Sequence, residues 1–265
     1  MLVTIVKYVS LILCSYLLGS VLFAKVLSKT QKDDITKHDS GNPGTMNMLR
    51  THGVVFGACT FVLDALKGVI AALAGYLLFG GSDGGLVARA AIYIGGVSAV
   101  IGHMFPIFFK FKGGKGVATA SGIAFVAHPI IGAILLACYI VLLLIIRIGS
   151  LSSLLIAIAY LIVDTVMLII EQNFVALILL YIVVALIIWA HRSNIKRLIN
   201  KNENVVDLNA AVQKDIERIH ANKEKRKQKS SLNKQTKTDL EANSKSDNAE
   251  ENKTQTSEIN NTKTE

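Results

Sequence analysis

The sequence predicts an all-α integral membrane protein, a bundle of seven transmembrane helices followed by a polar tail. Of its 265 residues, 52% are hydrophobic and only 18% are charged, and its mean hydropathy is +0.48. A soluble domain of this length rarely has such a composition. The apolar residues lie before Ala190, in blocks of about 20 residues or more, the length that a helix needs to cross a bilayer.

Each expected span is an apolar block bounded by polar or glycine-rich sequence. The block 117–146 is ambiguous, because its 30 residues would make a helix of about 45 Å against a hydrocarbon core of about 30 Å. His128-Pro129 lies in its middle, and the residue before a proline disfavours the helical conformation, so we expect two short or tilted spans there. The seven expected spans are 2–27, 54–79, 86–102, 117–128, 129–146, 151–170 and 174–189.

The charges of the loops predict the orientation. If successive loops alternate sides, nearly all loop Lys and Arg fall on one side, in 28–50, 103–116, 147–150 and the chain after 190. The loops on the opposite side contain no Lys or Arg; they are 80–85, 128–129 and 171–173. The positive-inside rule then places the N-terminus outside and the C-terminus in the cytoplasm.

The chain divides into a membrane domain, residues 1–203, and a cytoplasmic polar tail, residues 204–265. Residues 205–219 keep some helical periodicity, but from Lys223 onward the composition cannot bury a core and predicts disorder. The basic run 223–229 is compatible with contact to anionic lipid and with a tail that only increases solubility.

Several classes of function are disfavoured. The +9 charge flanks spans and fills the tail, which fits membrane topology and lipid headgroups better than nucleic acid. Three cysteines lie in apolar segments without CxxC spacing, and six histidines are scattered without an HExxH motif. We therefore expect no disulfide framework, no metal site and no cofactor.

A cationic glycine loop is the most informative motif, in the sequence HMFPIFFKFKGGKGVATA from His103 to Ala120. Glycine backbone N–H groups and lysine charges suit an anion such as phosphate. Gly116 stands where a Walker A loop has Ser or Thr. A plain positive-inside loop is an equally open interpretation. The phosphate-binding candidates here are Lys112, Gly113, Gly114, Lys115 and Gly116.

Three further polar groups fall on the same expected side. Arg50 follows a turn rich in short polar residues and can bind phosphate through two donors. Ser150 precedes a helix, where an N-cap role is the alternative. His191 and Asn194 are three positions apart and share a helix face. Asp64 and Lys67, also three apart but inside a span, are expected to form a structural ion pair.

Together these groups resemble the bacterial acyl-phosphate:glycerol-3-phosphate acyltransferase family, which has three cytoplasmic motifs on seven spans. The first motif resembles Gly19-Ser20, Asp34-Ile35 and Ser40-Gly41-Asn42-x-Gly44-x-x-Asn47-x-x-Arg50. The second is similar to Gly102-His103-x-x-Pro106 through Phe111-Lys112-Gly113-Gly114-Lys115-Gly116-Val117-Ala118-Thr119. The third is similar to His191-Arg192-x-Asn194-Ile195-x-Arg197-Leu198 with Glu203. Departures from the family pattern are Thr36 for Arg, Asp39 for Gly, Pro43 for a branched apolar residue and Lys201 for Gly.

The resemblance implies transfer of a fatty acyl group from acyl phosphate to the 1-hydroxyl of glycerol 3-phosphate. This is the first acylation in bacterial phospholipid synthesis, at the cytoplasmic face of the cell membrane, and it gives lysophosphatidic acid and phosphate. An acyl phosphate is already activated, so the reaction needs no acyl-enzyme intermediate on Ser or Cys. It needs residues that hold two phosphates and that stabilise the developing oxyanion. The expected catalytic residues are His191, Asn194, Ser40 and Arg50. The expected binding residues are Asn42, Asn47, Lys112, Gly113, Gly114, Lys115, Gly116, Ser150 and Glu203.

Partners implied by the resemblance are the two substrates, membrane lipid and, as a further candidate, the enzyme that makes the acyl phosphate. A transporter or flippase for a phosphorylated metabolite or lipid is the competing interpretation, since it also needs a cationic pocket and several helices. The concentration of charges on one side and the lack of an internal repeat favour an interfacial enzyme.

Overall fold

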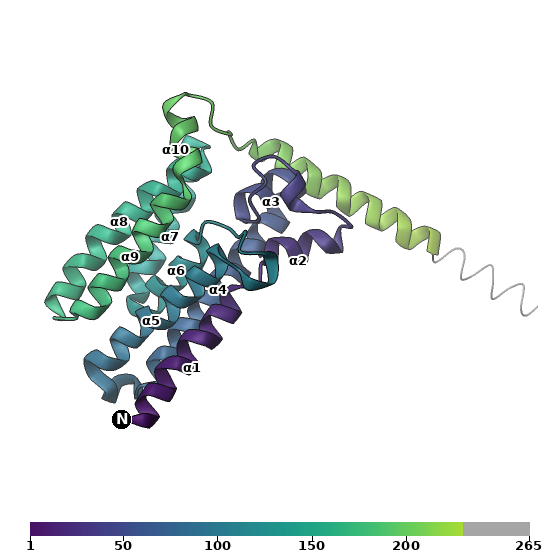
Figure 1. Ribbon diagram of the computed structural model, residues 1–265. Helices are drawn as coiled ribbons and strands as arrows, with labels where there is room; N and C mark the ends of the chain where they lie inside the picture. The colour runs from purple at the N-terminus through teal and green to yellow at the C-terminus, as the bar shows by residue number, and fades with distance from the viewer. Residues whose placement is uncertain (230–265) are drawn as a thin grey trace, which may run out of the picture. The chain divides into compact units, whose positions relative to one another are not determined.

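The computed structural model (Figure 1) describes residues 1–229, and every regular element among them is helical. The chain divides into two units, Met1–Asp215 and Ile216–Glu265. The first unit contains all the helices that surround the site. Its apolar helices are α1 (Leu2–Gly19), α4 (Val54–Leu78), α5 (Gly85–Met104), α6 (Val117–Ala127), α7 (Pro129–Ile146), α8 (Gly149–Ile170) and α9 (Phe174–Ala190).

The lengths of these helices support a protein that crosses a membrane several times. Five helical segments of the described residues are long and apolar enough to span a bilayer, and a sixth is counted if α9 and the helix after it, bent by 54°, form one span. The short apolar helix α6 does not reach that length. The count of seven spans therefore stays a prediction.

Burial distinguishes central from peripheral helices. In the segment containing α5, 67% of the apolar stretch is buried, against only 6% in α7, which has the highest hydropathy of these five segments. On α7, Ile130 is 78% exposed and Ile145 is 73% exposed. Because water would disfavour so much uncovered apolar surface, lipid is the solvent that fits the outside of the bundle.

Small residues let the central helices approach closely. A Cβ atom on Gly75 of α4 would lie 2.1 Å from the Ala91 carbonyl oxygen of α5, and one on Gly95 would lie 2.2 Å from the Ala71 oxygen. Gly102 similarly lies against the Tyr16 carbonyl of α1. These contacts require glycine because a larger side chain would separate the backbones, the packing mode common between membrane helices.

The expected break at His128-Pro129 is present. Helix α6 ends at Ala127 and α7 begins at Pro129. The imidazole of His128 contacts Asp164 on α8, with 2.6 Å between Nδ1 and Oδ1, and the Tyr93 hydroxyl of α5 donates to the same carboxylate at 2.6 Å. The turn is thus tied to α5 and α8, at the end of α6 opposite the glycine loop.

The expected first span, residues 2–27, is interrupted. Helix α1 stops at Gly19, and a separate amphipathic helix, α2 (Phe23–Thr30), follows. The physical reason is the buried Lys67 ammonium of α4, whose Nζ donates to the carbonyl oxygens of Gly19 at 3.0 Å and Val21 at 2.8 Å. Those carbonyls are satisfied without continuing the helix.

Other segments are more helical than expected. The polar loop 28–50 contains a short 3₁₀ turn, η1 (Ile35–Lys37), and part of helix α3 (Thr45–His52), and α10 (Arg192–Ile199) follows α9. Residues 208–229 are helical, so the expectation of disorder from Lys223 is wrong for 223–229. The rest of that expected disorder, 230–265, lies outside the described residues.

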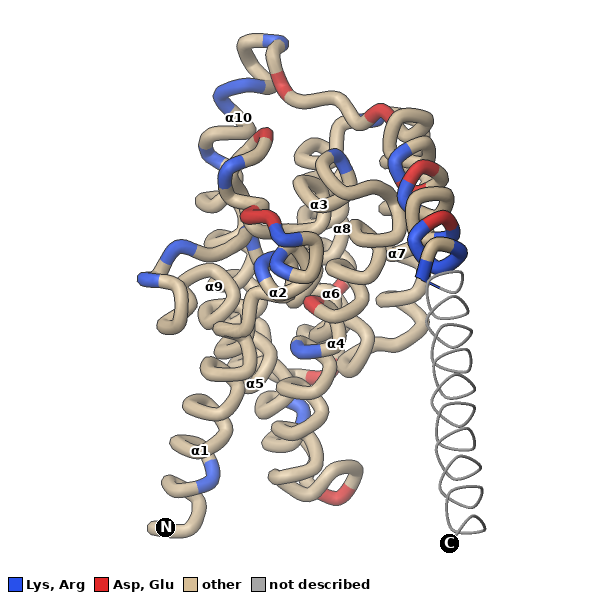
Figure 2. The backbone as a smooth tube through the Cα atoms, turned by 90° about the vertical axis from the view of Figure 1, so that its right-hand side faces the viewer, with Lys and Arg blue, Asp and Glu red and all other residues tan. Residues whose placement is uncertain are grey.

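Charge is distributed unevenly along the bundle. Figure 2 shows Lys and Arg concentrated at the end that carries α2, α3 and α10, with few at the end where the chain begins. This distribution agrees with the loop charges of the sequence.

Candidate active site

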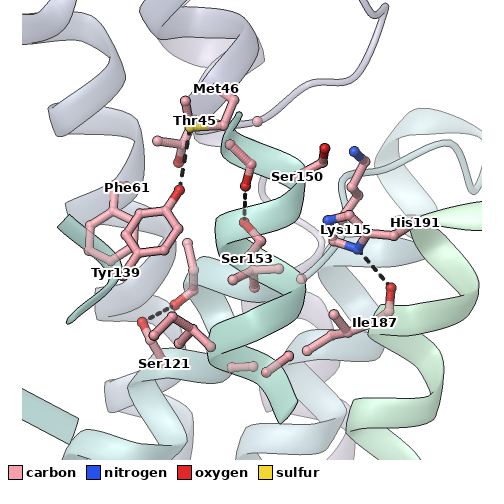
Figure 3. A pocket seen from close by; sticks show the side chains of 18 of the residues that line it. Thr45, Met46, Phe61, Lys115, Ser121, Tyr139, Ser150, Ser153, Ile187 and His191 are labelled. Carbon is pink, nitrogen blue, oxygen red and sulfur yellow. Dashed lines mark hydrogen bonds between the residues drawn. The ribbon is translucent and has the colours of Figure 1, made fainter. Parts of the chain in front are cut away.

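A pocket opens near the basic end of the bundle and extends between the apolar helices (Figure 3). Helices α4, α6, α7, α8 and α9 supply its walls, while α3 and α10 supply polar groups. Segments far apart in the sequence meet here. The predicted site residues that line the pocket are Ser40, Asn42, Asn47, Arg50, Lys115, Gly116, Ser150, His191, Asn194 and Glu203.

Three predicted phosphate ligands of the glycine loop lie outside the pocket lining: Lys112, Gly113 and Gly114. The two glycines serve the folding of the loop against the end of α5. A Cβ atom on Gly113 would lie 2.0 Å from the His103 carbonyl oxygen, and one on Gly114 would lie 2.1 Å from His103 Nε2. Lys112 is exposed, so the loop directs Lys115, and not Lys112, into the pocket.

Glu203 is the centre of the polar network. Its Oε1 accepts hydrogen bonds from Asn194 Nδ2 at 2.6 Å and Ser150 Oγ at 3.0 Å, and its Oε2 accepts one from Arg197 Nε at 2.8 Å. Burial disfavours ionisation of this carboxyl, but the three donors outweigh burial and lower its pKa below the ordinary value. The carboxylate therefore holds α8 and α10 in one arrangement.

Lys115 brings a second positive charge to this network, in addition to Arg197. Its Nζ donates to Asn194 Oδ1. Burial lowers the pKa of Lys115 from the ordinary lysine value to about 8, with Arg197 and Arg50 acting in the same direction and Glu203 opposing them. The ammonium is therefore mostly charged at neutral pH but poorly compensated, a state that favours binding of an anion.

His191, which follows the end of α9, is neutral at neutral pH. Burial, followed by the Lys115 charge, lowers its pKa to about 4. Its Nδ1 lies 2.8 Å from the carbonyl oxygen of Ile187, which only accepts, so Nδ1 carries the proton. The other nitrogen, Nε2, then presents a lone pair to a hydroxyl donor. Figure 3 shows His191 beside Lys115, with Ser150 nearby.

The loop before α3 forms a second cationic part of the site. Asn47 is 1% exposed, and its amide donates to the carbonyl oxygens of Ile35, His38 and Asn42 at 3.0 to 3.1 Å. Asn47 thereby fixes the turn that carries Ser40 and Asn42. Arg50 extends from α3 into the same region, where its Nε donates to Asp39 Oδ2.

The deeper part of the pocket is apolar. Phe61 of α4 and Tyr139 of α7 lie parallel, 6.4 Å between ring centres, and Leu135, Leu136 and Tyr160 also line this part. Sequence reasoning did not identify these residues, because an apolar side chain that lines a pocket resembles one that faces lipid. A pocket that is cationic at one end and apolar at the other suits an amphiphile.

The expected ion pair of Asp64 and Lys67 is present, with 2.9 Å between Oδ1 and Nζ. Lys67 also lies 2.8 Å from Nδ1 of His103. Both Asp64 and His103 line the pocket, so this ion pair borders the candidate site. Among residues 1–229, no group of three or more His, Cys, Asp or Glu side chains is arranged to hold a metal ion.

Comparisons with known proteins agree with this architecture. The family model of glycerol-3-phosphate acyltransferase matches residues 9–201. The glycerol-3-phosphate acyltransferase of Bacillus velezensis is 39% identical over 196 residues, which is 73% of this chain and 94% of that protein. The corresponding protein of Pelagibacter ubique is 40% identical over 199 residues, 74% of this chain and 96% of that one.

Solved structures give the same result. The crystal structure of PlsY (YgiH), an integral membrane glycerol 3-phosphate acyltransferase, in its glycerol 3-phosphate form is 35% identical, has a TM-score of 0.67, and matches over 76% of this chain and 96% of that chain. Its lysophosphatidic acid form gives a TM-score of 0.65 at 34% identity, over 77% of this chain and 98% of that chain. This chain belongs to the glycerol-3-phosphate acyltransferase family.

Proposed function

We propose that the protein transfers a fatty acyl group from an acyl phosphate to the 1-hydroxyl of glycerol 3-phosphate, giving lysophosphatidic acid and inorganic phosphate. The observation that carries this proposal is the pocket itself, which joins two cationic groups and a neutral histidine to an apolar interior. Family membership supports the acceptor. The choice of acyl phosphate as donor is what the sequence resemblance implies, and the chemistry of the site is compatible with it.

Two phosphates need two cationic positions. Lys115 and the hydroxyl of Ser150 suit the phosphate of the acyl donor, because Lys115 donates to Asn194 and Ser150 donates to the same Glu203 carboxylate as Asn194. Arg50, Ser40 and Asn42 suit the phosphate of glycerol 3-phosphate, since a guanidinium binds phosphate oxygens through two donors at once.

The acceptor hydroxyl would lie against Nε2 of His191. A base whose conjugate acid has a pKa of about 4 orients the hydroxyl well but removes a proton poorly. The hydroxyl oxygen attacks the carbonyl carbon, the bond from that carbon to the phosphate oxygen breaks, and the leaving phosphate accepts the proton. The phosphate is the stronger base, with a second pKa of about 6, so no acyl-enzyme and no strong protein base is needed.

The developing oxyanion would be stabilised by the Lys115 ammonium, whose charge lies in a largely buried setting where electrostatic interactions are strong. The acyl chain would extend past Phe61 and Tyr139 toward Tyr160, away from the phosphates. We further propose that the basic end of the bundle faces the cytoplasm of a bacterial cell and that the N-terminus lies outside, as the charge distribution supports.

An assay on the purified full chain, in detergent or lipid cubic phase with EDTA, tests the proposal. Labelled glycerol 3-phosphate is offered with palmitoyl phosphate or with palmitoyl-CoA. We expect lysophosphatidic acid from the acyl phosphate alone. Product from the CoA ester alone would overturn the donor assignment, and no product from either, with protein shown to be folded, would favour the transporter interpretation.

A further inference from the structure

A stretch of chain just beyond the family match contacts the site. The match ends at residue 201, and the two relatives named above align over 73% and 74% of this chain, which corresponds to 94% and 96% of their own length. Residues 204–215, which we call the strap, nevertheless pack on the loop and helix that carry Arg50. They belong to the same structural unit as the bundle.

The strap is anchored along its length. Val206 is fully buried and Ala211 is 2% exposed, and both pack against Leu49, the neighbour of Arg50 on α3. The backbone N–H of Val206 donates to the carbonyl oxygen of Arg147 at 2.7 Å. This position is therefore a fixed contact rather than a loose extension.

The far end of the strap holds the junction between α3 and α4. Asp215 Oδ2 accepts from the backbone N–H of Val55, in the first turn of α4, at 3.1 Å. Lys214 Nζ donates to the carbonyl oxygen of Arg50. A carboxylate at the start of a helix and an ammonium at the end of the preceding one both complement the helix dipoles.

The near end of the strap reaches the side chain of Arg50 through Asp39. Asn204 Nδ2 donates to Asp39 Oδ1 at 2.7 Å, while Asp39 Oδ2 accepts from Arg50 Nε. Asp39 has a φ of +45°, in the left-handed region that costs a residue with a Cβ about 1 kcal/mol. The family pattern has glycine at this position, and glycine adopts such a φ without steric cost. Asp39 bears that cost but places a carboxylate between Arg50 and the strap.

We infer that the strap positions Arg50 for phosphate, acting through the chain of contacts from Asn204 to Asp39 to Arg50; this inference rests on the proposed function. Asp39 engages the Nε edge of the guanidinium. Arg50 lines the pocket, and its terminal edge, with two amino groups, would supply the donors that a phosphate needs. Asp39 and Asn204 are thus positioning residues, and the strap lies beyond the residues that the family model matches.

Kinetics of full-length variants test the inference. Asn204→Ala removes the hydrogen bond that orients Asp39, and Asn209→Ala is the matched control, an exposed asparagine of the same strap. We expect Asn204→Ala to raise the KM for glycerol 3-phosphate about three- to tenfold, the usual effect of one lost hydrogen bond, with kcat within about twofold. Asn209→Ala is expected to match wild type.

The conservative variants sharpen the test. Asn204→Asp places a second carboxylate against Asp39 and should raise the KM more than Asn204→Ala does, with a smaller difference at high salt. A KM that falls in Asn204→Ala would mean that Asp39 competes with phosphate for Arg50, and an unchanged KM would mean that the strap is independent of the site. Either result overturns the inference.

A measurement without turnover separates this inference from the proposed function. Amide hydrogen exchange of residues 36–50 should become faster in Asn204→Ala than in Asn209→Ala, whichever reaction the protein catalyses. Failure of acyl transfer in wild type would contradict the proposed function. Amide exchange of residues 36–50 that is equal in Asn204→Ala and Asn209→Ala would contradict the inference that the strap positions Arg50.

Discussion

The pKa of Lys115 predicts an alkaline limit to activity. With a pKa of about 8, the fraction of charged Lys115 falls from ~90% at pH 7 to ~10% at pH 9 by the ordinary titration relation. If only the ammonium binds the donor phosphate, kcat/KM for the acyl phosphate falls roughly tenfold over this range. The substrate phosphates stay doubly charged throughout, because their second pKa is about 6.

The assay is the initial rate of lysophosphatidic acid formation at low acyl phosphate, from pH 6.5 to 9.5, corrected for spontaneous hydrolysis of the donor. Lys115→Arg supplies the control, since a guanidinium stays charged across the range. This variant should be slower at neutral pH but lose the alkaline limit. A flat wild-type profile, or an identical limit in Lys115→Arg, would refute the assignment of Lys115 as the titrating group.

Three substitutions test the remaining contacts. Glu203→Gln keeps the size of the side chain but loses the negative charge that accepts from three donors. Since a hydrogen bond to a charged group contributes about 1.5–3 kcal/mol, we expect kcat/KM to fall roughly ten- to hundredfold. An unchanged kcat/KM would show that Glu203 is not part of the site. Arg50→Lys keeps the positive charge but loses the planar guanidinium that can donate two hydrogen bonds to one phosphate, so the KM for glycerol 3-phosphate should rise about tenfold. A wild-type KM would mean that the charge of Arg50 only sets the membrane topology. Lys67→Met leaves Asp64 buried without its cation and should lower the free energy of unfolding in detergent by about 3–5 kcal/mol, which a lower melting temperature would report. The double variant Lys67→Met with Asp64→Asn should recover part of this loss, and an equal loss in the single and the double variant would contradict the pairing.

Much of the architecture could be predicted from the sequence, because span length and loop charge are properties of the chain itself. The break at His128-Pro129 and the ion pair of Asp64 with Lys67 follow from local rules. The end of α1 at Gly19 does not, since it depends on a lysine 48 positions away. The break inside the expected first span could therefore not be predicted from local rules.

The site shows a similar division. Sequence spacing grouped Lys112 and Lys115 as equivalent, because a flexible glycine loop does not reveal which lysine turns inward. In the structure Lys115 lines the pocket, whereas Lys112 is exposed. Asp39 stood out in the sequence as a departure from the family pattern, but its explanation required Asn204, which lies 165 positions later.

Counting hydrogen-bond donors separates the roles of the two buried lysines. An ammonium has three N–H donors, and Lys67 directs its donors at two carbonyl oxygens and His103, with Asp64 at 2.9 Å. Lys67 therefore has no donor left for a substrate, although its partners Asp64 and His103 line the pocket. Lys115 donates to Asn194 alone among the described side chains, so two of its donors remain for phosphate oxygens. The charge that is already satisfied holds the fold, and the charge that is incompletely satisfied is the one suited to bind an anion.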